Sequence, residues 1–182
     1  MKNTTRISIG ALAVGLTLAS AVHAEGAKFM DPTGDDKGPG NYTYPTDAVY
    51  TPGSFDLTEF EITAGDNPDV KVTVNSKLAD PWGMGVGFAV QMVFIFIDKD
   101  GKAGSGHTEG LPGLNVQFAP EAAWEKVIVF SPQPQSRVTA EIKAKASALA
   151  ADIVVPRRTS GAGRTISAKV KLEDLGGGDP AT

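Results

Sequence analysis

Carboxylate side chains are concentrated between residues 31 and 47, in the segment DPTGDDKGPGNYTYPTD. Like charges so close together repel one another unless a bound cation or solvent relieves the repulsion. Calcium accepts about six to eight oxygen ligands in flexible geometry, so an irregular loop of Asp and Gly suits it better than it suits magnesium. A solvated turn, in which Asp and Gly are favoured for backbone reasons alone, explains the composition equally well. The segment therefore predicts a calcium loop or a plain turn, with the candidate ligands Asp31, Asp35, Asp36 and Asp47.

A second acidic segment, DKDGKAGSGHTEG, spans residues 98–110. Counted from Asp98, it places Asp100 third and Glu109 twelfth, which are ligand positions in an EF-hand loop. The fifth position is Lys102, which is no ligand, and the sixth lacks the glycine that an EF-hand turn needs. The spacing argues against an EF-hand. It predicts either a calcium loop at a strand end, held by Asp98, Asp100 and Glu109, or a plain turn.

His107 is the only histidine after residue 24, and the chain has no cysteine. One histidine cannot build a multi-histidine zinc or copper site, and no G-x-S-x-G motif accompanies it. The absence of cysteine excludes thiolate catalysis, iron–sulfur clusters and stabilising disulfides. Haem held by His107 with Met30, Met84 or Met92 is an alternative. The polar, glycine-rich surroundings predict instead that His107 lies in a surface loop.

Aromatic side chains suggest carbohydrate binding, because amphipathic rings can stack on the C–H faces of a sugar. Trp82 lies in the Pro/Gly-rich stretch ADPWGMGVG, and a tryptophan in a loop is a better binding candidate than one in a strand. Tyr42 and Tyr44 lie within the first acidic segment. We take Trp82, Tyr42 and Tyr44 as candidate ligand-binding residues, with packing in the protein as the alternative for Trp82. Trp124, which precedes a strand, is predicted to be a core residue.

Strand patterns separated by Gly/Pro turns dominate the chain. Residues 55–63 and 70–77 alternate apolar and polar side chains around the turn AGDNPD, which predicts an antiparallel hairpin with one buried face. In the first of these strands we expect Phe55 and Leu57 on the apolar face.

Residues 86–100 and 125–131 are apolar on both faces, as in central strands covered on both sides. Further strands are expected at 137–145 and twice within 151–175, and a short helical turn within 119–126. The sequence therefore predicts an all-β fold: an antiparallel β-sandwich of the jelly-roll or immunoglobulin-like kind.

The first 24 residues have the pattern of a secretory signal peptide. Lys2 and Arg6 precede an apolar run over residues 7–21, and Ala24 ends a small-residue cleavage site. An uncleaved anchor is the alternative, although the run is short for a membrane span. We expect one exported domain over residues 25–182, periplasmic or secreted.

Charge disfavours some partners of this domain. Taking away Lys2 and Arg6 leaves 15 of the 17 basic residues against 21 acidic ones, a net charge of −6 instead of −4. Nucleic acids and anionic lipids both require a basic face, so neither is expected as a partner. No segment after residue 24 is apolar and long enough for a bilayer span, so we expect no integral membrane protein.

Two long stretches resemble the glucodextranase C-terminal domain family. They are the run FMDPTGDDKGPGNYTYPTDAVYTPGSFDLTEFEI over residues 29–62, and ADPWG followed by residues 87–118. The resemblance implies a non-catalytic β-sandwich related to family 9 carbohydrate-binding modules and DOMON-like domains, with a carbohydrate- or envelope-binding role. Calcium is common in such sandwiches, and the segment of Asp31, Asp35 and Asp36 and the loop of Asp98 and Asp100 are the positions it nominates. The family domain runs through one more strand, so the ending LGGGDPAT predicts a truncated chain that lacks its last strand, with a short disordered tail as the alternative.

These observations favour an exported, non-enzymatic module that binds carbohydrate or envelope glycan and holds calcium in a loop. Two alternatives stay open. One is a periplasmic DOMON-like domain associated with haem or redox chemistry. The other is the accessory part of a glucan hydrolase, since paired carboxylates can hydrolyse glycosides. Most acidic residues here fall in turns, which argues against catalysis by this chain.

Overall fold

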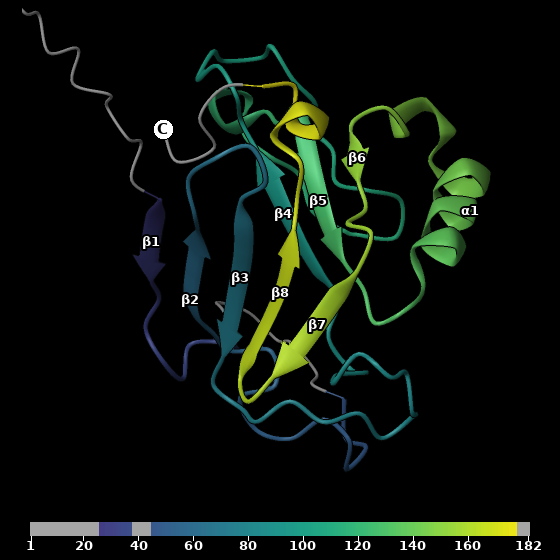
Figure 1. Ribbon diagram of the computed structural model, residues 1–182. Coiled ribbons are helices and arrows are strands. Elements are labelled where there is room, and N and C mark those ends of the chain that lie inside the picture. The colour runs from purple at the N-terminus through teal and green to yellow at the C-terminus, as the bar shows by residue number, and fades with distance from the viewer. Residues whose placement is uncertain (1–25, 38–44, 178–182) are drawn as a thin grey trace, which may run out of the picture.

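A computed structural model describes residues 26–37 and 45–177 of the protein, which form mostly β structure. The signal peptide predicted over residues 1–24 lies outside the described residues, as do Tyr42 and Tyr44, so these remain predictions. Within the described part, eight strands form two sheets (Figure 1). The antiparallel sheet has the order β1-β2-β3-β8-β7, with the bounds Ala27–Met30, Leu57–Ile62, Asp69–Val74, Thr165–Lys169 and Thr159–Ala162. The smaller sheet has the order β4-β5-β6, with the bounds Val93–Ile97, Lys126–Phe130 and Ile153–Val154.

The predicted hairpin is confirmed as the antiparallel pair β2 and β3. Val70, Val72 and Val74 are buried and alternate with half-buried polar residues, so one face of β3 points into the core. At the start of β2 the predicted face is wrong. Phe55 and Leu57 are 39% and 38% exposed, whereas Asp56 between them is 1% exposed. The register shifts between Leu57 and Glu59, and a shift of one residue exchanges the two faces of a strand.

The main core lies between the two sheets. It joins Val72 of β3 and Ile166 of β8 to Ile128 and Phe130 of β5. The intervening residues of β5, Val127 and Val129, belong to a second core on the other side of the smaller sheet. β5 is therefore covered on both faces, as its sequence predicts.

β4 is shorter than predicted. Only Val93–Ile97 forms a strand, while residues 86–92 run as a loop. Gly87 explains part of this difference, since its φ is +85° and a Cβ there would collide with the carbonyl of Gly161. The chain needs glycine at this close approach, and the left-handed backbone conformation interrupts the strand.

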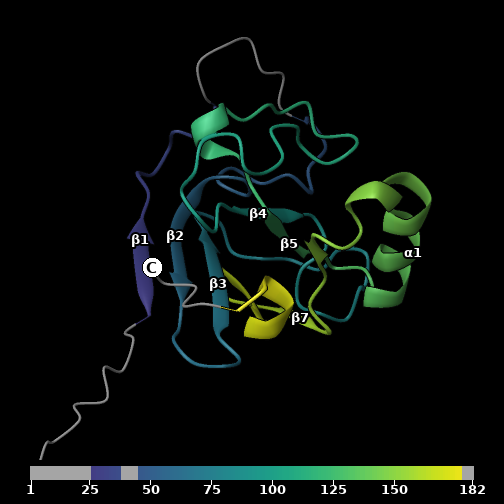
Figure 2. The same cartoon turned by 90° about the horizontal axis from the view of Figure 1, so that it is seen from above.

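The prediction of a strand at residues 137–145 is wrong. Gln135–Lys145 form the α-helix α1, which lies beside β6 on the side of the molecule away from β1 (Figures 1 and 2). Val138 and Ile142 are spaced for one face of a helix as well as for one face of a strand, so periodicity alone could not decide. Val138 packs against the second core, and Glu141 pairs with Lys145 one helical turn away.

The helix also changes the topology from the purely antiparallel prediction. α1 and the 3₁₀ helix η2, Ser147–Leu149, connect β5 to β6, and these two strands pair in parallel. Parallel neighbours require such a crossover connection. The fold is thus mostly β with one α-helix among the described residues. The assignment to a jelly-roll or immunoglobulin-like type stays a prediction.

A helical turn within residues 119–126 is confirmed as the 3₁₀ helix η1, Pro120–Ala122. Within residues 151–175 the structure has three strands, β6, β7 and β8, where two were expected. β7 and β8 form an antiparallel hairpin with Gly163 and Arg164 at its tip. A third 3₁₀ helix, η3, covers Leu172–Leu175. No helix in the described ranges is both long and apolar enough to cross a membrane.

Candidate functional site

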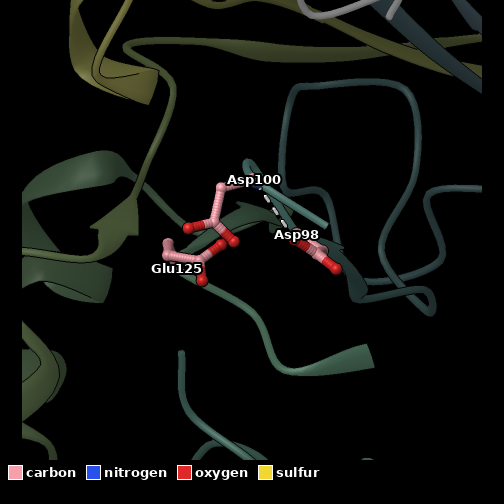
Figure 3. A group of neighbouring side chains, drawn as sticks. All are labelled: Asp98, Asp100 and Glu125. Atoms are coloured by element: carbon pink, nitrogen blue, oxygen red, sulfur yellow. Dashed lines mark hydrogen bonds between the residues drawn. The ribbon is translucent and has the colours of Figure 1, made fainter. Parts of the chain in front are cut away.

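Three carboxylates meet where β4 ends and β5 begins. Asp98 directly follows β4, Asp100 lies in the next turn, and Glu125 directly precedes β5 (Figure 3). Each offers one oxygen, and these three atoms lie within 4.8 Å of one another. Calcium–oxygen distances of about 2.3–2.6 Å place two ligands of one ion up to about 5 Å apart. The group therefore has the spacing and the ligand chemistry of a cation site.

Backbone amides fix two of these carboxylates in place. Asp98 Oδ1 accepts hydrogen bonds from the amides of Asp100, at 3.1 Å, and Gly101, at 2.8 Å. Glu125 Oε2 accepts one from the Lys99 amide at 2.8 Å. The turn is thus arranged around its acidic side chains before any ligand binds.

Hydrogen bonds also keep Asp100 charged. The Ser105 hydroxyl, followed by the Lys102 amide, holds the pKa of Asp100 below its ordinary value. The same hydroxyl lies 2.8 Å from Asp100 Oδ1 and 3.0 Å from Glu125 Oε1. A hydroxyl has one proton, so it can donate to only one of the two carboxylates at a time. Lys102 lies 3.4 Å from Asp100, but such an exposed ion pair contributes little.

Glu125 was not among the predicted ligands, and Glu109, which was, is not in the group. Glu125 arrives there through strand pairing, because Ile97 at the end of β4 pairs with Lys126 at the start of β5. The Glu125 amide donates to the Ile97 carbonyl at 3.0 Å. Pairing the two apolar strands in antiparallel register could have found this residue, whereas the EF-hand spacing pointed to Glu109.

The N-terminal carboxylates are spread more widely. Asp31, Asp35 and Asp47 are exposed and Asp36 is half-buried. Asp47 Oδ1 accepts a hydrogen bond from the Val49 amide at 3.0 Å, as in an ordinary Asx turn. Within residues 26–37 and 45–177, no three of these carboxylates come together as Asp98, Asp100 and Glu125 do. A cation held by them stays a prediction.

Trp82 lies on a loop that is held in shape by hydrogen bonds between its own residues. Asp80 Oδ1 accepts a hydrogen bond from the Met84 amide at 2.7 Å, and Asp80 Oδ2 accepts one from Gly85 at 2.8 Å. Gly83, with φ at +65°, completes the turn by donating to the Asp80 carbonyl at 3.2 Å. The tryptophan at the tip is 56% exposed. Sequence reasoning identified Trp82 and overlooked Asp80, which holds the loop.

A cleft of about 220 Å³ adjoins this loop. Met84 contributes to one wall, and the connection between β6 and β7 contributes another. Small-molecule pockets usually measure about 300–1,000 Å³, so a long ligand would lie across this cleft rather than inside it. Its polar lining comes from Ser131, Gln133, Gln135, Arg157, Arg158 and Thr159.

Trp124 and His107 have structural contacts. Trp124 is 1% exposed and donates from Nε1 to the Glu109 carbonyl at 3.0 Å, so its prediction as a core residue is confirmed. His107 was expected simply in a surface loop. Its ring instead packs on Trp124 with centroids 4.6 Å apart, and its Nε2 lies 2.9 Å from Asp152 Oδ2. The haem alternative stays a prediction.

The comparisons with known proteins agree with the family resemblance. Residues 27–182 match the family described as the C-terminal binding module, SLH-like, of glucodextranase. The match spans most of the chain and covers both sheets, the acidic group and the Trp82 loop. No curated protein sequence matches the chain.

The contact between His107 and Asp152 generates a prediction on acid stability. Hydrogen bonds from His107, and then from Lys126, lower the pKa of Asp152. Its contribution to stability is therefore complete above the unfolded-state pKa of about 3.9 and is lost as pH falls through the lower folded-state pKa. We expect Asp152→Asn to flatten the dependence of the unfolding free energy on pH below about pH 4, measured by urea denaturation. Asp66→Asn, at an exposed turn aspartate, serves as the control and should parallel the wild type. Parallel curves for Asp152→Asn would contradict the assignment.

Proposed function

We propose that this chain, which belongs to the family of C-terminal binding modules of glucodextranase, is an exported, non-catalytic module that binds carbohydrate or cell-envelope glycan. The observation that carries the proposal is Trp82, an exposed tryptophan on a loop braced by Asp80. The module occupies residues 25–182 and follows a signal peptide over residues 1–24.

The rigidity of the Trp82 loop matters because ordering a binding residue costs affinity. The hydrogen bonds of Asp80 fix the backbone of the loop, so binding would not have to order the segment that carries Trp82. Tryptophan also offers a large contact area with only two side-chain torsions. We retain Tyr42 and Tyr44 as further ligand-binding residues on the strength of the sequence.

The adjoining cleft supports the same role. Its amide, hydroxyl and guanidinium groups can donate to sugar hydroxyls, while Met84 supplies apolar contact beside the Trp82 loop. An aromatic platform next to a few convergent polar groups is the usual composition of a small-molecule site. The net charge of −6 for residues 25–182 suits a neutral glycan better than a polyanion.

We propose calcium as the metal of the group formed by Asp98, Asp100 and Glu125. The group offers only oxygen ligands, carries negative charge and lies in a glycine-rich turn, which are the conditions that calcium prefers. The cation would relieve the repulsion among the carboxylates and hold the turn to the start of β5. A calcium loop through Asp31, Asp35, Asp36 and Asp47 remains part of the proposal on sequence grounds.

Glycan binding is tested at Trp82. Affinity electrophoresis of the full chain in gels containing amylose or dextran, and sedimentation with purified cell walls, should show retardation or co-sedimentation. We expect Trp82→Ala to weaken binding at least tenfold, equivalent to about 1.4 kcal/mol, and Trp82→Phe to retain most of it. Val116→Ala, which also removes an exposed apolar group, should change nothing. Equal binding by Trp82→Ala and the wild type, or no binding by the wild type to any of these glycans, would contradict the proposal.

Calcium binding at the acidic group is tested at Glu125. Saturation at a hundredfold excess over the dissociation constant stabilises a protein by about 2.7 kcal/mol, so calcium should raise the Tm measured after chelation. Glu125→Gln should lose part of this rise. Glu109→Gln is the matched control, since Glu109 lies outside the group, and it should respond like the wild type. If both variants respond as the wild type does, the cation is not bound by this group.

A further inference from the structure

Polar side chains are buried together at the end of the molecule where β2 and β4 begin. Six polar residues in the described ranges are buried, and four of them precede β2, follow β3 or precede β4. The loops that carry them lie together at the lower end in Figure 1. We call these four the Asp56 cluster: Ser54, Asp56, Ser76 and Gln91, which are 4%, 1%, 9% and 5% exposed.

The side chain of Asp56 is buried, but only one of its two carboxylate oxygens has hydrogen-bond partners. Its Oδ2 accepts hydrogen bonds from the Gly34 amide at 2.7 Å and from Asn75 Nδ2 at 2.9 Å. Its Oδ1 has no hydrogen-bond partner in the described part of the chain. No lysine or arginine within residues 26–37 and 45–177 forms an ion pair with it. A buried charge with neither a countercharge nor a full set of hydrogen bonds is strongly unfavourable.

Gln91 presents a second buried oxygen of this kind. Its Nε2 donates to the Ser54 carbonyl at 3.1 Å, while its Oε1 has no partner among the described residues. Turning the amide over would place Oε1 against the Ser54 carbonyl, where two acceptors would face one another. The observed orientation is therefore the favourable one, and it leaves an amide oxygen directed into the protein.

The chemistry of these two atoms narrows the choice of ligand. Both are acceptors when Asp56 is ionised, and an anion cannot bind to two acceptors. Water could donate to both oxygens but would leave the charge of Asp56 uncompensated. A divalent cation would compensate the charge and take both oxygens as ligands. The two side chains are linked through Ser54, which lies two residues before Asp56 and whose carbonyl accepts from Gln91 Nε2 at 3.1 Å.

The candidate ligand atoms are oxygens, which are the ligands that calcium prefers. No histidine or sulfur ligand belongs to the cluster, and its serines add hydroxyl oxygens. The Thr51 hydroxyl lies 2.9 Å from Ser54 Oγ and 2.8 Å from Ser76 Oγ, and the Gly53 carbonyl accepts from the Asp56 amide at 3.3 Å.

We propose that Asp56 and Gln91 are ligands of a buried divalent cation, of the calcium class, that fastens the N-terminal acidic loop and the two sheets to one another. Asp56 directly precedes β2 of the larger sheet, and Gln91 lies two residues before β4 of the smaller one. Gly34 of the acidic loop donates to the same carboxylate. The site is separate from the group of Asp98, Asp100 and Glu125, which follows β4 at its opposite end. It does not depend on the proposed function.

The test is carried out in the Glu125→Gln background, which weakens calcium binding at the other group. In this parent, calcium should raise the Tm after chelation, and isothermal titration should show a binding event that belongs to the Asp56 site. Adding Asp56→Asn should weaken this binding event at least tenfold and reduce the rise in Tm. Asparagine can keep the hydrogen bonds from Gly34 and Asn75, and it removes the buried charge. The Asp56→Asn protein in chelator should therefore melt no lower than the parent in chelator. Adding Asp66→Asn instead should leave the calcium response unchanged.

A second variant keeps the test decisive if Asp56→Asn fails to fold. Gln91→Glu adds a charge to the site, so it should lower the Tm in chelator and bind calcium at least threefold more tightly than the parent. Absence of any calcium response in the folded parent would overturn the proposal. So would equal calcium responses in the parent and in folded Asp56→Asn. A response to magnesium or potassium but not to calcium would overturn the assignment of the cation.

Discussion

A buried carboxylate without a countercharge is the constraint on which this structure depends. Asp56 is 1% exposed and receives hydrogen bonds from Gly34 and Asn75, which come from the N-terminal loop and from the end of β3. Three segments distant in sequence therefore meet at one side chain. Such an arrangement is favourable only if its charge is balanced, so the packing of this end of the molecule is coupled to whatever supplies the positive charge.

The smaller sheet connects the Asp56 cluster to the acidic group of Asp98, Asp100 and Glu125. β4 connects Gln91 at one end to Asp98 at the other, and β5 holds the sheet in place because each of its faces packs into a core. The loop of Trp82 leaves β3 and returns towards β4, beside the Asp56 cluster. In this account the aromatic platform owes its position to two effects: the hydrogen bonds of Asp80 within the loop, and the cation-dependent packing of the segments on either side of it.

Much of the fold could be predicted from the sequence, because buried strand positions appear as alternating or continuous apolar residues. The three valines of β3 and the apolar run of β5 predicted a hairpin strand and a central strand. Val138 and Ile142 fit a strand and a helix equally well, so α1 and the parallel pairing that it imposes were missed.

The candidate sites were less accessible to sequence reasoning. Glu125 joins Asp98 only through the register of β4 and β5. Asp56 looked like an outward-facing residue, because sequence alternation does not show the register shift in β2 that turns it inward. The family resemblance and the exposed position of Trp82 were within reach of the sequence, whereas the buried oxygens were not.

The most direct test of the central claim is a crystal structure of the full chain grown with calcium, with anomalous diffraction data collected at a wavelength where calcium scatters anomalously. The account predicts an anomalous peak about 2.3–2.6 Å from both Asp56 Oδ1 and Gln91 Oε1. A map without a peak there, in which a water molecule or a direct hydrogen bond satisfies those two oxygens, would contradict it.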